Sequence, residues 1–473
     1  MIHAQTTPET SVNHDEVTIV FASPQPVGKF IDGYPYVIGR TEIIGYSPAC
    51  ETLEDGRIIH GAMINPDCGV ASGFDSGGAK SGDRQPKWLP ELNVGADISK
   101  EKPLVLEPGQ SLLIATSNTG VIDRTNPLLK RVVVLTCLAE APPADAFRPA
   151  YANADKTIHT WSQVKTDRLQ NIEVVGTPPT WDSINERFKR FLLDMVPNWD
   201  RGHLSPKDHA PLYGRDLSTN AGTAYLMVNS DYPLEEKKTA LIGLIQRGID
   251  GYGVFQNATR NGRQPWSADG GHHSGRKFSI MFAGALLGDE AMENVVLQTE
   301  YENPGSSKRF QEDIMSFYVD ENLINVSNSP EWNPPYKDKR PQQPYSSAML
   351  GMPDWRGNVQ VAASSASWSG HPYRISANTA SQHGQALAAI SMGLRPAWRN
   401  EAYFDYHARF LEIMAGRPDP WGTMRGETLA YPSVTGSVPE EGWAGWMQHW
   451  NDNWSWEMIQ HHWKNYYQYS WQS

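Results

Sequence analysis

The stretch Trp266-Ser-Ala-Asp-Gly-Gly-His-His-Ser-Gly-Arg-Lys277 places glycines and titratable groups directly before an apolar segment. Within that segment, residues 278, 281, 282 and 285 fall on one face at helical spacing. We therefore predict a buried helix over 276–287 that is entered through the polar loop. A helix N-terminus carries partial positive charge and unpaired N–H groups, so this position favours an anionic ligand.

The charge of this region is opposite to the charge of the whole chain. The 473 residues carry a formal net charge of -12, which argues against nucleic acid or an acidic membrane as a general partner. Residues 240–280 instead carry +3, from five Arg or Lys and two Asp. No segment approaches the ~20 consecutive apolar residues of a membrane span. Any affinity for an anion is therefore expected to be local.

Residues 1–150 have the pattern of a β domain. Short β-branched runs alternate with turn pairs such as Asp32-Gly33 and Pro108-Gly109, which is typical of an antiparallel, sandwich-like domain. The runs are Val17–Phe21, Tyr36–Ile38, Thr41–Ile44, Ile58–Ile59, Leu104–Leu106, Ser111–Ala115 and Arg131–Thr136. Residues 141–149, rich in proline and alanine, are the predicted linker to a second domain.

Residues 151–473 change to helical periodicity. Ser183-Ile-Asn-Glu186 matches a capping box and predicts a helix that continues to Met195. Further helices are predicted over 217–228, 231–252, 290–300, 379–392, 401–414 and 448–467. Paired helices with short loops indicate an α/α array that curls into a toroid, so the predicted fold class is α+β, with an N-terminal antiparallel β domain followed by a toroid-like helical domain.

The aromatic content of the chain indicates what kind of ligand it binds. The chain has 17 tryptophans, eight of them from Trp421 onward, and flat apolar sugar faces stack on such side chains. A β-rich domain joined to an α/α toroid resembles bacterial polysaccharide lyases and some glycoside hydrolases, and the segments Gly270–Lys277 and Phe404-Asp-Tyr406 are similar to segments of bacterial proteins of that build. Many such lyases place the β domain after the toroid, whereas here the β-rich part comes first.

The resemblance implies β-elimination on an acidic, uronate-containing polysaccharide. In toroid lyases an Asn or Arg neutralises the uronate carboxylate, and a Tyr or His transfers protons. The expected catalytic residues are His272, Tyr213, Asn220, Arg276 and Tyr252. The expected substrate-binding residues are Arg215, Trp266, Asp269, His273, Lys277, Trp443 and Trp446. His272 would act as the base, because histidine titrates near neutral pH, and Tyr213 or Tyr252 as the acid.

Several alternatives stay open at the level of sequence. Core packing explains Tyr252 as well as catalysis does, and helix capping explains Asn220 equally well. A glycoside hydrolase would need paired carboxylates, for which the candidates are Asp250, Asp269 and Glu427. A non-catalytic carbohydrate-binding or virion protein would also account for the aromatic content.

No cofactor is expected, although weak metal signals exist. Zinc could bind His272-His273 with Asp269, or His203 with His209, and calcium could bind the loop Asp75–Asp83. Cys50 and Cys68 could form a disulfide that leaves Cys137 free. The sequence begins without a basic, then apolar, leader, so we expect a secreted or extracellular chain in its mature form, a phage-derived depolymerase of a capsule or exopolysaccharide, or a cytosolic chain.

Overall fold

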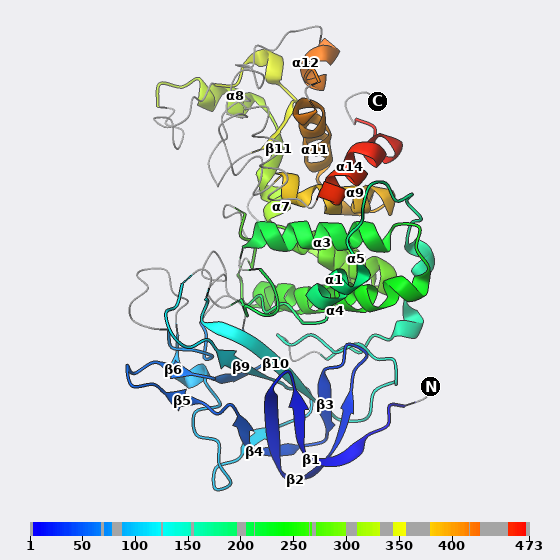
Figure 1. Ribbon diagram of the computed structural model, residues 1–473. Helices are drawn as coiled ribbons and strands as arrows, with labels where there is room; N and C mark the ends of the chain where they lie inside the picture. The colour runs from blue at the N-terminus through cyan, green and yellow to red at the C-terminus, as the bar shows by residue number, and fades with distance from the viewer. Residues whose placement is uncertain are drawn as a thin grey trace.

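The computed structural model describes most of the chain. The described ranges are 3–67, 71–77, 88–123, 126–152, 156–195, 205–211, 213–263, 265–266, 271–298, 310–331, 344–355, 379–415, 417–425 and 453–469. A β-sheet at the N-terminal end lies against a layer of helices, and further helices lie beyond that layer (Figure 1). The chain is therefore mixed α/β, with a β-rich first part and a helical remainder, and the toroid stays a prediction.

The strands of the first part form one curved, eight-stranded sheet. They are β1 Thr7–His14, β2 Val17–Lys29, β3 Pro35–Ile38, β4 Thr41–Ser47, β7 Ala62–Ile64, β8 Leu104–Leu106, β9 Ser111–Ser117 and β10 Leu129–Leu138. The order is β7-β9-β10-β3-β2-β4-β8 with β1 on β2, and only the β10–β3 pair is parallel. β5 Glu51–Thr52 and β6 Ile58–Ile59 form a separate ribbon. All seven predicted runs lie in strands. The described strands of this part form one curved sheet and one short ribbon, and a sandwich of two stacked sheets is not observed among them.

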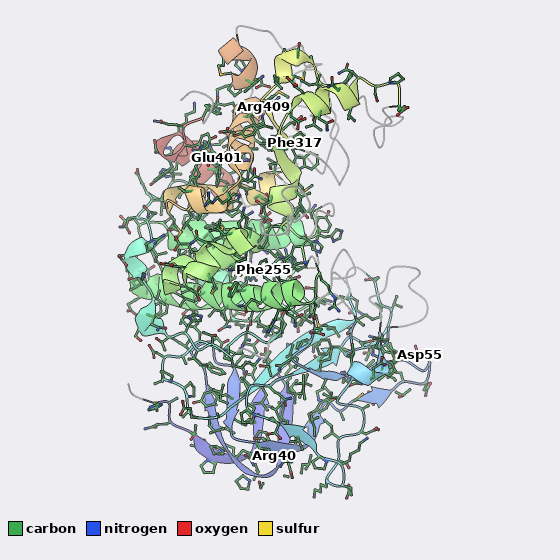
Figure 2. The ribbon with its side chains drawn as sticks, turned by 180° about the vertical axis from the view of Figure 1, so that it is seen from behind. Arg40, Asp55, Phe255, Phe317, Glu401 and Arg409 are labelled. Atoms are coloured by element: carbon green, nitrogen blue, oxygen red, sulfur yellow. The ribbon has the colours of Figure 1, made fainter. Side chains whose placement is uncertain are left out.

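Both faces of the sheet are covered, which explains its apolar strands. In β9, Leu112 and Ile114 belong to a core on one face, while Leu113 and Ala115 belong to the core shared with the helices. This alternation follows the two-residue period of a strand. Side chains such as Phe255 fill the layers beyond the sheet (Figure 2), and one continuous core joins the sheet to the helices. The predicted boundary near residue 150 is therefore crossed by apolar packing.

The helical part is built around a central layer. Its main helices are α1 Trp181–Phe188, α3 Gly214–Val228, α4 Leu234–Arg260 and α5 Arg276–Leu287, followed by the short α6 Glu290–Glu293. α5 matches the prediction, and every one of its residues is buried. The capping box was misplaced: the side chain of Thr180, and not that of Ser183, caps α1 by accepting from the Ser183 N–H, and the helix ends at Phe188, well before Met195.

The remaining helices lie on the side of the central layer away from the sheet (Figure 1). They are α7 Gln311–Met315, α8 Glu321–Ser327, α9 His383–Ser391, α10 Arg395–Trp398, α11 Glu401–Met414, α12 Pro420–Arg425 and α14 Asn453–Tyr466, with the ribbon β11 Ser316–Tyr318 and β12 Pro353–Trp355. α11 has the predicted bounds, and α9 and α14 lie within theirs. Among the described helices, none combines the length and the apolar character needed to cross a membrane.

Candidate functional site

The start of α3 and the loop before α5 meet at the protein surface. Tyr213 is the residue before α3, and its ring lies edge-on to the ring of His272, with centroids 4.5 Å apart. The backbone N–H of Gly271 donates to the Tyr213 hydroxyl at 3.1 Å. Both rings are partly exposed. The structure therefore brings together two of the predicted catalytic residues, from segments that are almost 60 positions apart.

A glycine makes this close approach possible. A Cβ atom on Gly214 would lie 2.0 Å from the carbonyl oxygen of His272, which is far inside van der Waals contact. Any other residue would push the loop and the helix start apart. Gly275, at the other end of the loop, has φ of 86°, in the left-handed region that favours glycine, and it directly precedes α5. The geometry of the Tyr213–His272 pair thus depends on two glycines that the sequence places beside it.

Further polar side chains lie on and beside α3. The guanidinium of Arg215 lies 5.0 Å from the centre of the Tyr213 ring and pairs with Asp216 at 2.7 Å. Farther along, the Asn220 side-chain oxygen accepts from Arg187 at 2.8 Å. Asn220 follows Tyr213 by seven residues, or about 10 Å along the helix axis. Sequence analysis missed Arg187, because nothing in the local sequence of α1 indicates a contact with α3.

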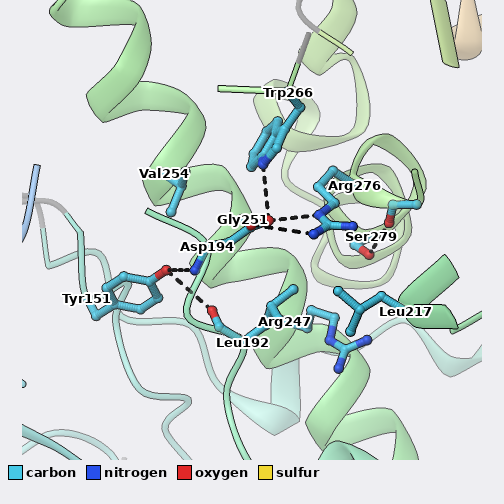
Figure 3. A pocket seen from close by; sticks show the side chains of 11 residues that line it. Tyr151, Leu192, Asp194, Leu217, Arg247, Gly251, Val254, Trp266, Arg276 and Ser279 are labelled. Atoms are coloured by element: carbon cyan, nitrogen blue, oxygen red, sulfur yellow. Dashed lines mark hydrogen bonds and ion pairs between the residues drawn. The ribbon is translucent and has the colours of Figure 1, made fainter. Parts of the chain in front are cut away.

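The predicted roles of Arg276 in catalysis and of Trp266 in substrate binding are wrong, because both side chains are buried. Arg276 is only 5% exposed, and its Nε donates to Asp194 at 2.7 Å. The indole N–H of Trp266 donates to the same carboxylate at 3.0 Å (Figure 3). The Trp266 ring also stacks on Phe310 and is almost fully buried. Arg276 is therefore neutralised from within the protein, and Trp266 offers no open face to a sugar.

Lys277 and His273 are buried in the same way. The Lys277 ammonium contacts the Asp313 carboxylate, donates to the Trp398 carbonyl at 2.5 Å and lies 4.4 Å from the centre of the Trp398 ring. Neither Lys277 nor His273 exposes any surface. The prediction that these two residues contact substrate is therefore wrong, because their polar atoms face the protein interior. Of the two adjacent histidines, only His272 reaches the surface.

The carboxylates expected of a hydrolase are not assembled among the described residues. Asp250 is 2% exposed and forms a double hydrogen bond with Arg148, at 2.9 and 2.6 Å, which assigns it to an internal ion pair. Burial raises the pKa of the Asp250 carboxyl, and Arg148 opposes that shift. The hydrolase prediction is wrong for Asp250. The other predicted residues Asp269, Glu427, Trp443 and Trp446 lie outside the described residues.

Tyr252 lies in a different environment from Tyr213. It is partly exposed on α4, and its hydroxyl exchanges hydrogen bonds with Gln298, whose Nε2 lies 3.2 Å away. Its ring stacks on Phe255. Neither of these contacts involves Tyr213 or His272. Tyr213 is therefore the better of the two candidates for the acid.

The candidate metal ligands have structural partners. Both ring nitrogens of His209 lie near backbone groups, Nε2 accepting from Val132 N and Nδ1 near Phe191 O, and burial lowers its pKa to about 4. Asp75 pairs with buried Arg57 at 2.7 Å. The described residues contain no group of three metal-ligating side chains, and the partners His203, Asp83 and Asp269 lie outside them. Cys50 and Cys137 are free thiols, and Cys68 also lies outside the described residues.

Comparison with known proteins adds no further assignment. No family model matches the chain, and no curated protein and no solved structure is similar to it. The candidate site therefore rests on its geometry. It consists of a tyrosine–histidine pair at the surface, Arg215 and Asn220 on α3, Arg187 on α1, and a glycine-bordered loop that holds the pair in place.

Proposed function

We propose that this chain cleaves an acidic, uronate-containing polysaccharide by β-elimination, with Tyr213 and His272 as its proton-transfer pair. The observation that carries the proposal is the contact between these two rings at the surface, with centroids 4.5 Å apart. Histidine and tyrosine are among the side chains that act as general base and general acid in enzymes, and histidine titrates near neutral pH. Their meeting at the protein surface favours proton transfer over a purely structural role.

In the proposed reaction His272 removes the C5 proton of the uronate and Tyr213 protonates the departing oxygen on C4. The C4–O bond breaks as the C4–C5 double bond forms, and the proton taken from C5 remains on the imidazole until it exchanges with solvent. The Gly271 N–H holds the Tyr213 hydroxyl oxygen, so that the hydroxyl has a defined orientation. Orientation of this kind is a large part of the advantage of an enzyme over free acid and base.

The proposed ligands of the uronate carboxylate are Arg215 and Arg187. Arg215 lies next to the Tyr213 ring, and Arg187 is held by Asn220 farther along the helix. A guanidinium has five N–H donors, so the bond from Arg215 to Asp216 is compatible with a second carboxylate on the same side chain. Arg215 and Arg187 are therefore proposed to bind the substrate carboxylate in place of Arg276 and Lys277, which are buried.

A spectroscopic assay tests the proposal. The purified chain is incubated with a panel of uronate polymers, including polygalacturonate, alginate, hyaluronan and a glucuronan, and both ultraviolet absorbance and reducing ends are followed. Elimination yields a double bond conjugated with the carboxylate, which absorbs in the ultraviolet. New reducing ends without this absorbance would indicate hydrolysis, and binding without any cleavage would indicate a carbohydrate-binding protein; either result would overturn the proposal.

A further inference from the structure

A small cavity is lined by residues of α3, α4 and α5 and of the segments that precede them, among them Leu217, Arg247 and Arg276 (Figure 3). Three charged side chains line it, Asp194, Arg247 and Arg276, together with apolar groups that include Leu217 and Val254. The space open to the centre of a water-sized molecule is about 20 Å³. That exceeds the ~10–15 Å³ needed for one water, so the cavity accepts a small polar group but not a sugar ring.

Arg247 is the unusual member of this wall. It is only 8% exposed, and in the described part of the chain it has no hydrogen-bond or ion-pair partner. Its closest defined contact is the face of the Phe188 ring, 4.4 Å from the guanidinium carbon. In Figure 3 its guanidinium lies apart from the Asp194–Arg276 pair. A guanidinium in this setting has lost most of its water and shares the Asp194 carboxylate with Arg276, which is an unfavourable state unless a second anion joins it.

The charges around the cavity do not balance. Arg276 engages the Asp194 carboxylate at 2.7 Å, so two guanidinium groups share one carboxylate on the described wall. Burial, reinforced by the charge of Arg276, lowers the pKa of Arg247 to about 10, which still leaves it protonated at neutral pH. The described wall therefore carries one excess positive charge, which a singly charged anion would neutralise.

We propose that this cavity binds a carboxylate group, with Arg247 as its principal ligand. A carboxylate matches the planar fork of a guanidinium through two parallel hydrogen bonds, carries the single negative charge that the wall lacks, and is small enough for the space. The group can belong to a free small acid, or to a uronic acid whose ring stays outside the cavity. The proposal is independent of the β-elimination chemistry, because binding is measured here without turnover.

Thermal unfolding of the full chain in sodium acetate tests the proposal. Ionic strength is kept constant with the sodium salt of a bulky sulfonate buffer, and parallel series contain sodium chloride or sodium glucuronate. Acetate is expected to raise the melting temperature of the wild type in a saturable way, by about 2 °C at high occupancy. In R247M the acetate-dependent rise should disappear, and the melting temperature without acetate should equal or exceed that of the wild type.

R40M is the matched control, because Arg40 has an exposed side chain on the sheet and its loss changes the net charge by the same amount. It should keep the full acetate response. R247K keeps the positive charge but loses the planar guanidinium, so it should give a weaker acetate response. If R247M does not fold, R247K replaces it as the test variant. A response to glucuronate that also requires Arg247 would identify a uronic acid as one source. An equal rise in chloride, or an acetate response that persists in R247M, would overturn the proposal.

Discussion

Asp194 accepts a hydrogen bond from Nε of Arg276 at 2.7 Å, although the two residues lie 82 positions apart in the chain. Trp266 donates to the same carboxylate, so one buried anion anchors both ends of the glycine-rich loop. The loop from Trp266 to Lys277 is thus fixed from inside by buried carboxylates. It presents His272, and not its arginine or lysine, to the surface.

Replacement of Asp194 should be strongly destabilising. D194N removes the only carboxylate on the described cavity wall and leaves Arg276 buried without a counter-charge, which costs about 3–5 kcal/mol in comparable cases. The measurement is the free energy of unfolding in urea. D97N is the control, since Asp97 pairs with Lys102 in an exposed salt bridge that is worth about 1 kcal/mol or less. Equal losses in the two variants would show that the Asp194 pair is not structural.

Arg148 should be equally important for attachment of the sheet to the helices. Its guanidinium bonds to Asp250 on α4 at 2.6 Å and to Asp32 in the turn between β2 and β3 at 3.3 Å. R148M leaves two buried carboxylates without their cation, so we expect a loss of about 3–5 kcal/mol in the free energy of unfolding. R148M/D250N should recover part of that loss, because one of the two unpaired charges is removed. A double variant no more stable than R148M would contradict this coupling.

His383 should account for part of the loss of folding stability at acidic pH. This side chain is fully buried among aromatic rings, and burial lowers its pKa to about 3. Above about pH 6.5 both folded and unfolded states hold it neutral. As the pH falls below 6.5, only the unfolded chain binds a proton there, so stability falls by about 1.4 kcal/mol per pH unit until the folded pKa is reached. H383F should reduce the slope of unfolding free energy against pH by that amount between pH 6 and 4.

The control for this experiment is a histidine with no such burial. His461 lies on the exposed side of α14, and H461F should leave the slope unchanged. His407, which packs against His383 and whose pKa burial also lowers well below its ordinary value, should continue to contribute in H383F. Parallel pH profiles for wild type and H383F would contradict the assignment.

A comparison of kcat/KM should show which of the two candidate tyrosines, Tyr213 or Tyr252, acts as the acid. Y213F removes the hydroxyl proposed to protonate the leaving oxygen, and loss of such a general acid lowers kcat/KM by about 10²–10⁴-fold. Y252F removes a hydroxyl that bonds to Gln298, so its kcat/KM should stay within about twofold of the wild type. Both variants should keep the wild-type melting temperature within a few degrees. The reverse ranking would transfer the acid role to Tyr252.

Local patterns predicted the elements well. α5 and α11 have the expected bounds because each has apolar residues at helical spacing, and α5 ends at Gly288, whose φ of 68° lies in the left-handed region that favours glycine. β1 was missed, since its sequence TPETSVNH is polar and largely exposed. The cap of α1 was misplaced by three residues because Thr180 and Ser183 both offer a suitable hydroxyl.

The candidate site could be predicted only in part. The loop at 266–277 was identified as a place where polar groups gather, and Tyr213 and His272 do meet. The direction of Arg276 and Lys277 could not be predicted, because their counter-charges, Asp194 and Asp313, come from 82 and 36 positions away. A cation-rich sequence segment does not reveal whether its charges face solvent or a buried carboxylate, since that depends on tertiary contacts.

The most direct test of the central claim is the rate at which H272A generates unsaturated product from a uronate polymer, relative to wild type. We expect the wild type to produce ultraviolet absorbance and H272A to be slower by at least about 10²-fold at an unchanged melting temperature. A rate in H272A equal to that of the wild type would contradict the role of His272, and no absorbance from the wild type on any uronate polymer would contradict β-elimination itself.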